Sequence, residues 1–447
     1  MSSKKRFAIV GAGGRSRMYI DGLCRDYPDN NELVGLCDPS FKRMEHWNTH
    51  IREAFGLNPV PIYEAGRFDE MVRETRPDEI IVTTVDSVHH QYIIRAMELG
   101  CDVVTEKPMT IDDEKVRAIF KTKEKTGRNL RVTFNYRYAP NWTRMRQVVA
   151  SGRIGRPTLV DFQWRLDTRH GADYFRRWHR EKQHSGGLLV HKATHHFDLV
   201  NWIIDSYPRR VFADGGLEFY GQDNAAERGE HYPYPRYTGE AQALRDRFAL
   251  RLDDGGIMQS LYLDAEEESG YIRDRNVFAG EDRWPITAED TMALTARYRN
   301  GALLNYSLIA YCPWEGERMT ITGTEGQVEY FGRGAGHIIA GQSDEQLADQ
   351  QYQGEKHLRL QRMFEPPLEI EIEAAVGGHG GGDAWILNQL FSPEPWDDPD
   401  GRAADHIDGA ASVLTGVAAE MSIESGAPVD LDDLMPLPEP THRAPNP

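Results

Sequence analysis

The stretch FAIVGAGGRS, residues 7–16, decides the fold class. Its first four residues form a short apolar run typical of a buried strand, and apolar residues at a looser helical spacing follow from Met18. The pattern Gly11-x-Gly13-x-x-Ser16 matches the dinucleotide-binding fingerprint, except that serine replaces the last glycine. Glycines here permit a tight turn and let backbone N–H groups approach a phosphate. We therefore expect a strand, a phosphate-binding turn and a helix, with an ordinary glycine turn as the alternative.

The residues that follow continue this alternation of strands and helices. A second apolar run, residues 33–37, ends at Asp38, and further buried strands are predicted at residues 79–84 and 102–105. Strands that alternate with helices indicate a parallel sheet covered on both faces. The sequence thus predicts an α/β protein in which residues 1–133 form an N-terminal Rossmann dinucleotide-binding domain.

Asp38 stands where a Rossmann strand carries the acid that accepts a hydrogen bond from a ribose 2′-hydroxyl. Its carboxylate repels a 2′-phosphate, which favours NAD over NADP. The cations Lys42 and Arg43 follow closely, so NADP remains the less favoured alternative cofactor. A turn at the end of the strand is the structural alternative for Asp38.

The pattern changes after about residue 133, where longer segments alternate apolar and polar residues. Such alternation is typical of an antiparallel sheet with one covered face. We therefore expect residues 134–435 to form an α+β domain with a large, mostly antiparallel open sheet, which binds substrate and forms the oligomer. The expected elements are strands at 157–166, 246–252, 291–298 and 303–309, a helix at 187–204, irregular structure at 215–239 and 332–365, and an unpacked Pro-rich tail at 436–447.

Composition excludes several classes of protein. The 447 residues include 52 Lys and Arg against 70 Asp and Glu, a formal charge of −18, which is the wrong sign for a general binder of nucleic acid or anionic membranes. No apolar stretch has the length of a signal-peptide core or of a membrane span. The four cysteines lie far apart, which indicates free buried thiols in a reducing compartment. We expect a cytoplasmic protein with a small-molecule substrate.

Five motifs follow one another along the chain. They are the loop 11–16, the segment 83–89, Glu106-Lys107-Pro108, Asn135-Tyr136-Arg137, and Gly186-Gly187 with His195 and Asp198. In this order they resemble the glucose-fructose oxidoreductase, inositol dehydrogenase and MocA (Gfo/Idh/MocA) family of nicotinamide enzymes. The resemblance implies a carbohydrate substrate and a homo-oligomer, a dimer or tetramer, formed through the second-domain sheet.

The resemblance also implies which residues bind the cofactor, for which we expect NAD. Lys107 comes directly after a predicted parallel strand, at the edge where open α/β sheets bind ligands. In this family such a lysine lies by the nicotinamide and hydrogen-bonds the reacting hydroxyl. The expected cofactor contacts are Gly11, Gly13, Gly14, Arg15, Ser16, Asp38, Thr84, His89, Glu106, Lys107 and Asn135.

The predicted helix 187–204 carries the candidates for a catalytic base. His191, His195 and Asp198 are spaced i, i+4 and i+7, so one continuous helix puts them on one face. The resemblance implies that His195 takes the hydroxyl proton as hydride leaves. The family has aspartate where this chain has His191, so the usual proton relay does not carry over directly and His191 is a second catalytic candidate. His196 and Lys192 are expected to point elsewhere on the helix.

Further polar residues are expected at the substrate. Arg273 and Arg275 share a face if extended, and surface ion pairs with Asp274 or with the acids 266–268 are the alternative. The segment His379-Gly-Gly-Gly-Asp383 permits a close backbone approach and, together with His191 and His195, offers metal-ligand types, although we expect no metal. The expected substrate contacts are Arg137, Lys192, Asp198, Arg273, Arg275, His379 and Asp383.

Three functions follow from these residues. The first is a dehydrogenase that oxidises a ring hydroxyl of a sugar, glycoside or polyol by hydride transfer to NAD, with His195, His191 and Lys107 as catalytic residues. The alternative is an NAD-dependent glycoside hydrolase or lyase, in which transient oxidation permits β-elimination and the cofactor is recycled in each turnover. The abundant histidines and the His379 segment, which resembles one in NAD-dependent α-N-acetylgalactosaminidases, favour this alternative. An NAD-binding sensor without chemistry is the third.

Overall fold

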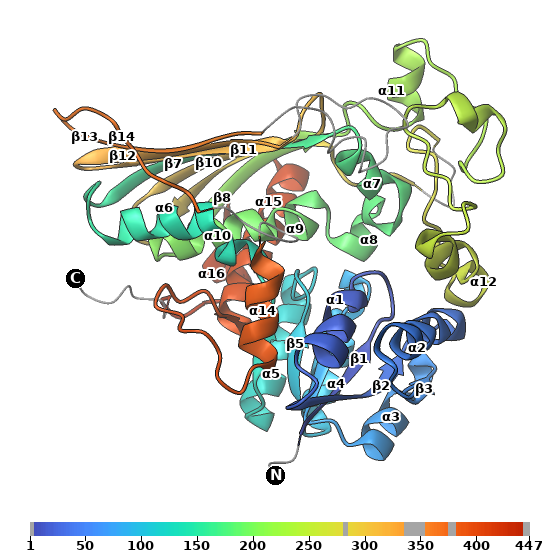
Figure 1. Cartoon of the computed structure of the whole chain (residues 1–447). Helices are drawn as coiled ribbons and strands as arrows, with labels where there is room; N and C mark the ends of the chain where they lie inside the picture. Colours follow the sequence, from blue (N-terminus) through green and yellow to red (C-terminus); the bar gives the residue numbers. More distant parts are fainter. Residues whose placement is uncertain (1–3, 280–284, 335–353, 374–380, 441–447) are drawn as a thin grey trace. The chain divides into compact units, whose positions relative to one another are not determined.

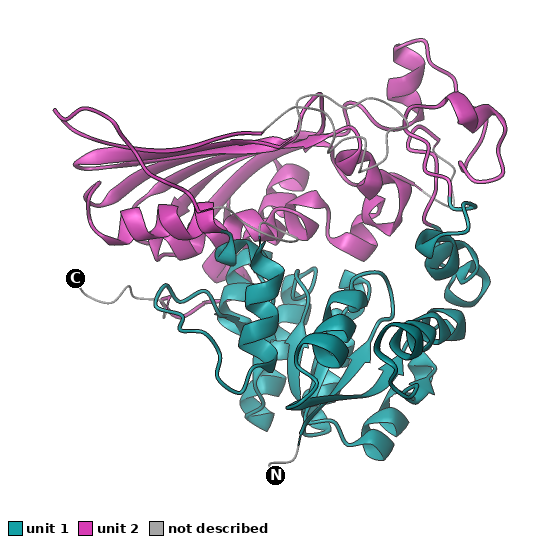
Figure 2. Cartoon of the chain, viewed as in Figure 1, with its two compact units in different colours: residues 1–139, 252–272, 376–413 teal, residues 140–251, 273–375, 414–447 magenta. Residues whose placement is uncertain are grey.

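The computed structural model describes residues 4–279, 285–334, 354–373 and 381–440. Contacts divide the chain into two compact units, which Figure 2 shows in different colours. Unit 1 comprises residues 1–139, 252–272 and 376–413, and unit 2 comprises residues 140–251, 273–375 and 414–447. The first boundary lies close to the division expected after residue 133, but unit 1 also takes up two segments from much later in the chain.

Unit 1 contains a seven-stranded sheet (Figure 1). Its pairs are parallel except where β15 joins β6. The first six strands lie in the order 3-2-1-4-5-6 of a Rossmann fold, so the predicted Rossmann domain is confirmed. In sheet order the strands are β15 (Ala404–Asp405), β6 (Leu130–Val132), β5 (Asp102–Thr105), β4 (Glu79–Val82), β1 (Lys5–Val10), β2 (Asn31–Cys37) and β3 (Ile62–Tyr63).

The strand order reverses between β1 and β4, and ligands of open α/β sheets bind at the carboxyl ends of the strands beside such a point. All four residues of β4 and the last four of β1 are buried, as expected for strands covered on both faces. The helices of this unit are α1 (Ser16–Asp21), α2 (Phe41–Phe55), α3 (Phe68–Thr75), α4 (His89–Glu98), α5 (Asp113–Thr126), α12 (Glu266–Ser269) and α14 (Gly382–Phe391).

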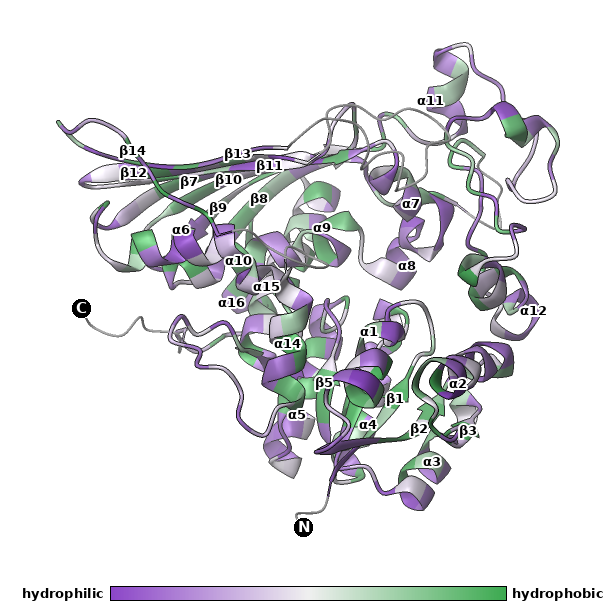
Figure 3. Cartoon of the chain, in the orientation of Figure 1, coloured by the Kyte–Doolittle hydropathy of each residue, from purple (hydrophilic) through white to green (hydrophobic). Residues whose placement is uncertain are grey.

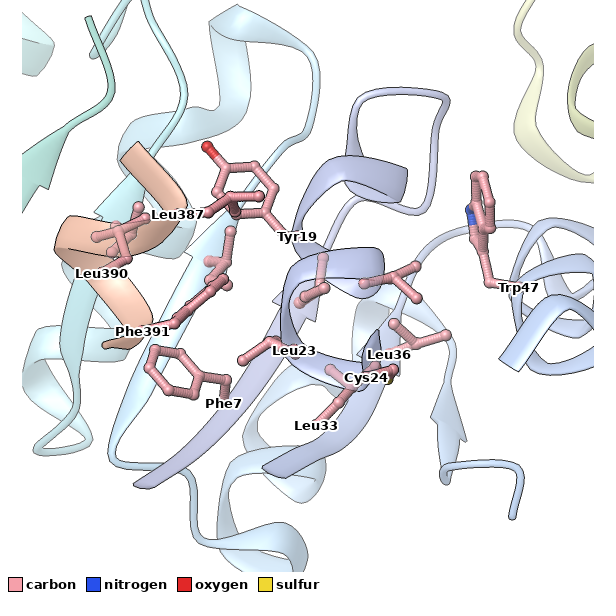
Figure 4. Packing of buried hydrophobic residues seen from close by; sticks show 14 of the residues in the cluster. Phe7, Tyr19, Leu23, Cys24, Leu33, Leu36, Trp47, Leu387, Leu390 and Phe391 are labelled. Atoms are coloured by element: carbon pink, nitrogen blue, oxygen red, sulfur yellow. The ribbon is translucent and has the colours of Figure 1, made fainter. Parts of the chain in front are cut away.

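Helix α14 completes the hydrophobic core of unit 1. Figure 4 shows Leu387, Leu390 and Phe391 of this helix packed beside Phe7 of β1 and Tyr19 of α1. The rings of Phe7 and Phe391 meet edge to face with centroids 5.0 Å apart. A segment from late in the sequence therefore stabilises the strand that leads into the glycine loop.

Unit 2 contains a nine-stranded sheet. Among the strands that the structure describes, only β7 and β10 pair in parallel, so the predicted mostly antiparallel sheet is confirmed. In sheet order the strands are β14 (Leu368–Glu369), β13 (Glu355–Arg362), β12 (Gly326–Arg333), β11 (Gly316–Gly323), β7 (Pro157–Asp167), β10 (Leu303–Cys312), β9 (Thr291–Tyr298), β8 (Pro208–Gly216) and β16 (Val429–Asp430).

One face of this sheet is covered. Buried positions alternate with more exposed ones along β9 and β10, and Figure 3 shows hydrophobic and hydrophilic residues mixed along the strands in the same way. Helices α6 and α10 lie along one face in Figure 1. The helices of unit 2 are α6 (Pro140–Ala150), α7 (His170–Arg176), α8 (Lys182–Ser185), α9 (Leu188–His191), α10 (Thr194–Ile204), α11 (Gln222–Glu227) and α16 (Leu431–Leu434), and α15 (His406–Ser425) begins in unit 1 and ends in unit 2.

Three expectations about local structure are wrong. Residues 246–252 form no strand, because the Asp246 carboxylate accepts the N–H of Phe248 at 2.8 Å and holds a turn. Residues 355–362, expected to be irregular, form β13. The described part of the Pro-rich tail is packed: Leu437 is buried, and its carbonyl oxygen accepts from Arg299 Nη1 at 2.7 Å.

Candidate cofactor and active site

The loop after β1 is fixed by close contact with the loop after β4. Gly11 has a φ angle of +93°, and a Cβ atom there would lie 2.6 Å from the carbonyl carbon of Thr83, so glycine is required. Thr83 Oγ1 donates to the Gly11 carbonyl oxygen at 2.5 Å. Ser16 Oγ donates to the Gly13 carbonyl oxygen at 2.7 Å, so the serine that replaces the last glycine of the fingerprint closes the turn.

Gly13 leaves the backbone of this loop accessible to a ligand, and Gly14 holds a hydroxyl at its N–H. No described atom lies within 4 Å of a Cβ built on Gly13. The N–H of Gly14 donates to the hydroxyl of Tyr262 at 3.1 Å, so an oxygen atom already fits at this donor. Pyrophosphate offers oxygen acceptors to such N–H groups. The loop therefore fits a dinucleotide, whose phosphates Gly13 and Gly14 would hold.

Asp38 lies directly after β2 and is buried. Its carboxylate accepts the N–H of Ala12 at 2.7 Å and the N–H of Ser40 at 2.9 Å. Arg43 Nη1 lies 3.6 Å away. Burial raises the pKa of Asp38 above its ordinary value, while Arg43 and the two N–H groups act in the opposite direction. The acid is thus joined both to the glycine loop and to the start of α2.

A cluster of charges, which we name the Arg15 cluster, lies at the same edge of the sheet. Arg15 Nε lies 2.6 Å from Glu106 Oε1, and its Nη2 lies 3.4 Å from Asp383 Oδ1. Two more donors reach these carboxylates: the Tyr19 hydroxyl contacts Glu106 at 2.7 Å, and Asn135 Nδ2 contacts Asp383 at 3.0 Å. Burial opposes ionisation of Glu106, but Arg15 and Tyr19 outweigh it and lower the pKa of this carboxyl. Glu106 is therefore ionised next to Lys107.

The Glu106-Lys107-Pro108 segment is tied to the loop after β4 by His89. The ring nitrogens of His89 lie 2.8 Å from the Pro108 carbonyl oxygen and 3.0 Å from that of Thr84. His89 is buried, and burial lowers its pKa, while the hydrogen bonds to the two carbonyl oxygens act in the opposite direction. His89 thus holds together the loops that follow β4 and β5, with Thr84 and Lys107 half-buried beside it. The peptide bond between Lys107 and Pro108 is cis.

Arg137 lies inside unit 1. Its side chain has 0% exposure, and Nη2 lies 3.2 Å from Asp408 Oδ1, which is also buried. The pair joins the turn Asn135–Tyr138 to the start of α15. This burial does not support the expected contact of Arg137 with substrate.

In unit 2 the predicted helix 187–204 is divided. α9 ends at His191 and α10 begins at Thr194. Between them the N–H of Ala193 bonds to the Leu188 carbonyl oxygen, five residues back, at 2.9 Å. This wider turn shifts the helical register. The expectation of one continuous helix through His191, His195 and Asp198 is therefore wrong, although His195 and Asp198 lie three residues apart on α10.

The rings of other residues surround these helices. His196 stacks on Trp164 with centroids 4.1 Å apart, and its Nδ1 lies 2.6 Å from the Tyr306 hydroxyl. Lys192 Nζ lies 5.1 Å from the centroid of Trp164, a cation–π contact. His191 meets the ring of His179 edge to face at 4.1 Å. The four polar side chains of this motif, His191, Lys192, His195 and Asp198, are all at least nine-tenths buried.

The start of α9 rests on a second cluster of charges, which we name the Lys182 cluster. Lys182 Nζ lies 2.6 Å from Glu289 Oε1 and 2.6 Å from Glu420 Oε2. Gly187, directly before α9, has a φ angle of +85°, and a Cβ there would lie 2.2 Å from Glu420 Oε1. Burial and the Glu289 carboxylate raise the pKa of Glu420 to about 7, although Lys182 acts in the opposite direction.

Sequence reasoning missed a group of polar residues near Lys192. Glu315 accepts from His170 Nδ1 at 2.7 Å, and His170 Nε2 lies 3.1 Å from the Tyr174 hydroxyl. Burial opposes ionisation of Glu315, but His170 and Lys192 outweigh it and lower the pKa of this carboxyl. His170 and Glu315 are 145 residues apart in the chain, so no local spacing connects them.

Arg273 and Arg275 form buried ion pairs. Arg273 Nη2 lies 2.5 Å from Asp173, and Arg275 Nη1 lies 3.4 Å from Glu181. Each arginine is only 8% exposed. These two partners, which the sequence did not indicate, come from the α7–α8 region. Asp274 pairs with Arg236 at 2.6 Å.

The remaining expectations concern metals and cysteines. His379 lies outside the described residues, whereas Asp383 belongs to the Arg15 cluster. Within the described ranges, no group of three His, Cys, Asp or Glu side chains is arranged to hold a metal ion. All four cysteines are buried free thiols, as predicted. None of the described helices has the length and apolar character that crossing a membrane requires.

Models of one sequence family match both parts of this chain. The GFO/IDH/MocA model described as "Oxidoreductase family, NAD-binding Rossmann fold" matches residues 5–134, and the one described as "Oxidoreductase family, C-terminal alpha/beta domain" matches residues 146–431. The chain belongs to the Gfo/Idh/MocA oxidoreductase family. The resemblance carried by the five motifs is thereby confirmed, and the fold is that of a nicotinamide-dependent oxidoreductase.

Relatives of this Gfo/Idh/MocA protein include dehydrogenases of inositols and sugars. YteT of Bacillus subtilis is 34% identical over 448 residues, which cover 97% of this chain and 99% of YteT. Inositol 2-dehydrogenase of Rhizobium meliloti is 30% identical over 212 residues, 47% of this chain and 58% of that enzyme. The WlbA dehydrogenase of Bordetella pertussis, solved in complex with NADH and UDP-GlcNAcA, shares the fold with a TM-score of 0.62 at 18% identity, over 98% of this chain and 100% of that one.

Proposed function

We propose that this protein is an NAD-dependent oxidoreductase that oxidises a ring hydroxyl of a sugar, glycoside or polyol. The observation that carries the proposal is the glycine loop at the switch point of the Rossmann sheet, with Lys107 following β5 at the same edge. The similarity to an inositol 2-dehydrogenase supports a polyhydroxylated ring as substrate.

The chain's own residues then have separate roles. Nicotinamide, when bound, supplies the acceptor for the hydride. The ammonium group of Lys107 donates a hydrogen bond to the reacting oxygen and stabilises its developing negative charge. Glu106 is ionised within the Arg15 cluster, and the positive charge of Lys107 also lowers the pKa of this carboxyl. His195 takes the proton of the hydroxyl, with His191 as the second candidate for this task.

Several finer assignments stay predictions. They are the contacts of Thr84, His89 and Asn135 with the cofactor, and those of Lys192, Asp198, Arg273, Arg275, His379 and Asp383 with substrate. The cytoplasmic location and the homo-oligomer formed through the sheet of unit 2 are predictions as well.

The test is incubation of the purified protein with NAD and a panel of inositols, free sugars and chromogenic glycosides. Reduced nicotinamide and released aglycone are recorded in parallel. We expect reduced cofactor to accumulate in proportion to oxidised product with at least one ring polyol or sugar. Aglycone released catalytically without net change in NAD would contradict the dehydrogenase and identify the redox-assisted elimination instead.

Two substitutions test the catalytic residues on the substrate so identified. We expect His195→Asn to lower kcat by about 10²- to 10⁴-fold and Lys107→Met to lower it by about 10²- to 10³-fold. The controls are His231→Asn and Lys121→Met, which change the same residue types at exposed positions. Full turnover by either test variant would exclude the role given to that residue.

A further inference from the structure

The segment 252–272 belongs to unit 1 although it interrupts the sequence of unit 2 (Figure 2). It contains the helical turn Gln259–Leu263 and the short helix α12. Its side chains and backbone contact the glycine loop at Gly14 and the first turn of α2. These are the places where a Rossmann fold holds the adenosine half of its dinucleotide.

This segment contacts Lys42 and Arg43, the two cations because of which the sequence left NADP as the less favoured alternative cofactor. Lys42 Nζ donates to the Asp264 carbonyl oxygen at 2.8 Å. Arg43 Nε donates to the Leu261 carbonyl oxygen at 2.8 Å, and its Nη2 donates to Ser269 Oγ at 3.2 Å. The Arg43 guanidinium is buried, with the ring centroids of two tyrosines, Tyr262 and Tyr271, 5.6 and 5.3 Å from its carbon. Both cations are thus engaged by this segment, and Arg43 Nη1 lies 3.6 Å from Asp38.

The same segment brings a carboxylate to the start of α2. Glu268 Oε2 accepts from Ser40 Oγ at 2.7 Å and from the N–H of Lys42 at 3.1 Å. Ser40 also donates its N–H to Asp38 at 2.9 Å, so one serine joins both carboxylates. The hydrogen bond from Ser40 and the N–H of Lys42 lower the pKa of Glu268, which is therefore negatively charged at neutral pH.

We propose that Glu268 is a specificity-determining residue that excludes the 2′-phosphate of NADP from the adenosine site. The inference rests on the proposed function and on the general position of the ribose acid, here Asp38. A 2′-phosphate would come next to Asp38, where Glu268 already accepts the Ser40 hydroxyl and the first N–H groups of α2. It would have to displace this carboxylate and then lie beside the carboxylates of Asp38 and Glu268, where the Arg43 guanidinium is already engaged by Asp38, Leu261 and Ser269. The ribose hydroxyl of NAD carries no such charge, so NAD is accepted.

The test measures binding of the reduced cofactors directly and needs no substrate. NADH and NADPH are titrated into the wild-type protein and into Glu268→Gln and Glu268→Ala, with nicotinamide fluorescence or calorimetry as the readout. Glu267→Gln is the matched control, because Glu267 is an exposed carboxylate on the same helix α12. The thermal unfolding midpoint of each variant verifies that it is folded.

We expect the wild-type protein to bind NADH at least 100-fold more tightly than NADPH. Both substitutions of Glu268 should narrow this ratio by at least tenfold, mainly through tighter binding of NADPH, and Glu267→Gln should leave it unchanged. An unchanged ratio in folded Glu268 variants overturns the inference, and so does equal binding of both cofactors by the wild type, while the cofactor site stands in both cases. Binding of neither cofactor contradicts the proposed function itself.

Discussion

The Arg15 cluster of unit 1 and the Lys182 cluster of unit 2 each contain one cation and two carboxylates. The pKa of the buried glutamate is shifted in opposite directions in the two clusters. In the Arg15 cluster the pKa of Glu106 is lowered, so this carboxylate keeps its negative charge. In the Lys182 cluster the pKa of Glu420 is raised to about 7, so this carboxyl binds a proton close to neutral pH. Both glutamates are mostly buried, at 7% and 8% exposure, so burial alone does not explain the difference.

Neighbouring charges and hydrogen-bond donors explain it together. The Arg15 guanidinium lowers the pKa of Glu106, whereas the Glu289 carboxylate raises the pKa of Glu420. Each carboxylate of the Arg15 cluster has a second donor, the Tyr19 hydroxyl for Glu106 and the Asn135 amide for Asp383. Glu420 has Lys182, and its Oε1 accepts no hydrogen bond from any described residue. Donors that stabilise the charged form lower a pKa, and burial without them raises it. A buried glutamate is thus ionised or protonated according to the charges and the hydrogen-bond donors around it.

The largest effect on stability is expected from Glu106→Gln, which removes the negative charge of this carboxylate. Arg15 loses its shorter ion pair, and we expect a loss of stability of about 1.5–3 kcal/mol at pH 7. Because the folded-state pKa of Glu106 lies below its ordinary value of 4.5, this stability is present above that value and is lost as pH falls through the folded-state pKa. Urea unfolding of wild type and variant, followed from pH 7 down to pH 3, measures the difference.

The control is Glu124→Gln, which removes an exposed carboxylate of α5. It should change the unfolding midpoint little at any of these pH values. A Glu106→Gln variant as stable as wild type at pH 7 would mean that the Arg15 cluster gains nothing from its charge, and the contrast between the two clusters would disappear.

Glu420→Gln should give a smaller effect with the opposite pH dependence. The folded-state pKa of about 7 exceeds the ordinary value of 4.5, so the stability that Glu420 contributes is present below pH 4.5 and is lost as pH rises through 7. The amide does not titrate. Relative to wild type, the variant should therefore become more stable between pH 5 and pH 8, by on the order of 1–2 kcal/mol.

The measurement is the unfolding midpoint of wild type and variant at pH 5 and at pH 8. Glu227→Gln, which changes an exposed glutamate, is the control. A constant difference between Glu420→Gln and wild type across this range would show that Glu420 does not titrate there. The Lys182 cluster would then resemble the Arg15 cluster.

Tyr19→Phe should have the smallest effect and tests the explanation itself. It removes one neutral donor from Glu106 and keeps the ring in the core of unit 1. We expect a loss of stability of about 0.5–1.5 kcal/mol and a shift of the acid-induced loss to higher pH, because the pKa of Glu106 rises. An unchanged acid profile in urea unfolding would show that Arg15 alone keeps Glu106 ionised.

Local sequence patterns were sufficient to predict the strands β1, β2, β4 and β5 of the Rossmann sheet and the residues at their carboxyl ends. The apolar runs at 33–37 and 102–105 predict β2 and β5, and the acid and the glycines lie within a few residues of the strands that position them. Backbone geometry there depends on residue type at fixed offsets, which a sequence displays directly. The predicted strand 291–298 coincides with β9 for the same reason, since period-two alternation is a local signal.

Tertiary contacts determine the parts of the structure that local sequence patterns did not predict. The wider turn at Ala193 divides a helix whose periodicity looks continuous. Gly187, directly before α9, lies against Glu420 from a helix more than 200 residues later. Glu268 and Tyr262 reach the glycine loop and α2 from a segment that reads as part of the second domain. Such contacts leave no trace at any fixed spacing, because the two partners are independent in sequence.

Helix α14 has a consequence for how the protein is synthesised. Its residues Leu387 and Phe391 fill the core around β1, yet the ribosome adds them after all but the last part of the chain has emerged. Until then Phe7 lacks the ring that covers it, so the first unit to be translated is among the last to be completed. Residues 1–139 made alone would expose that apolar surface to water and to other nascent chains.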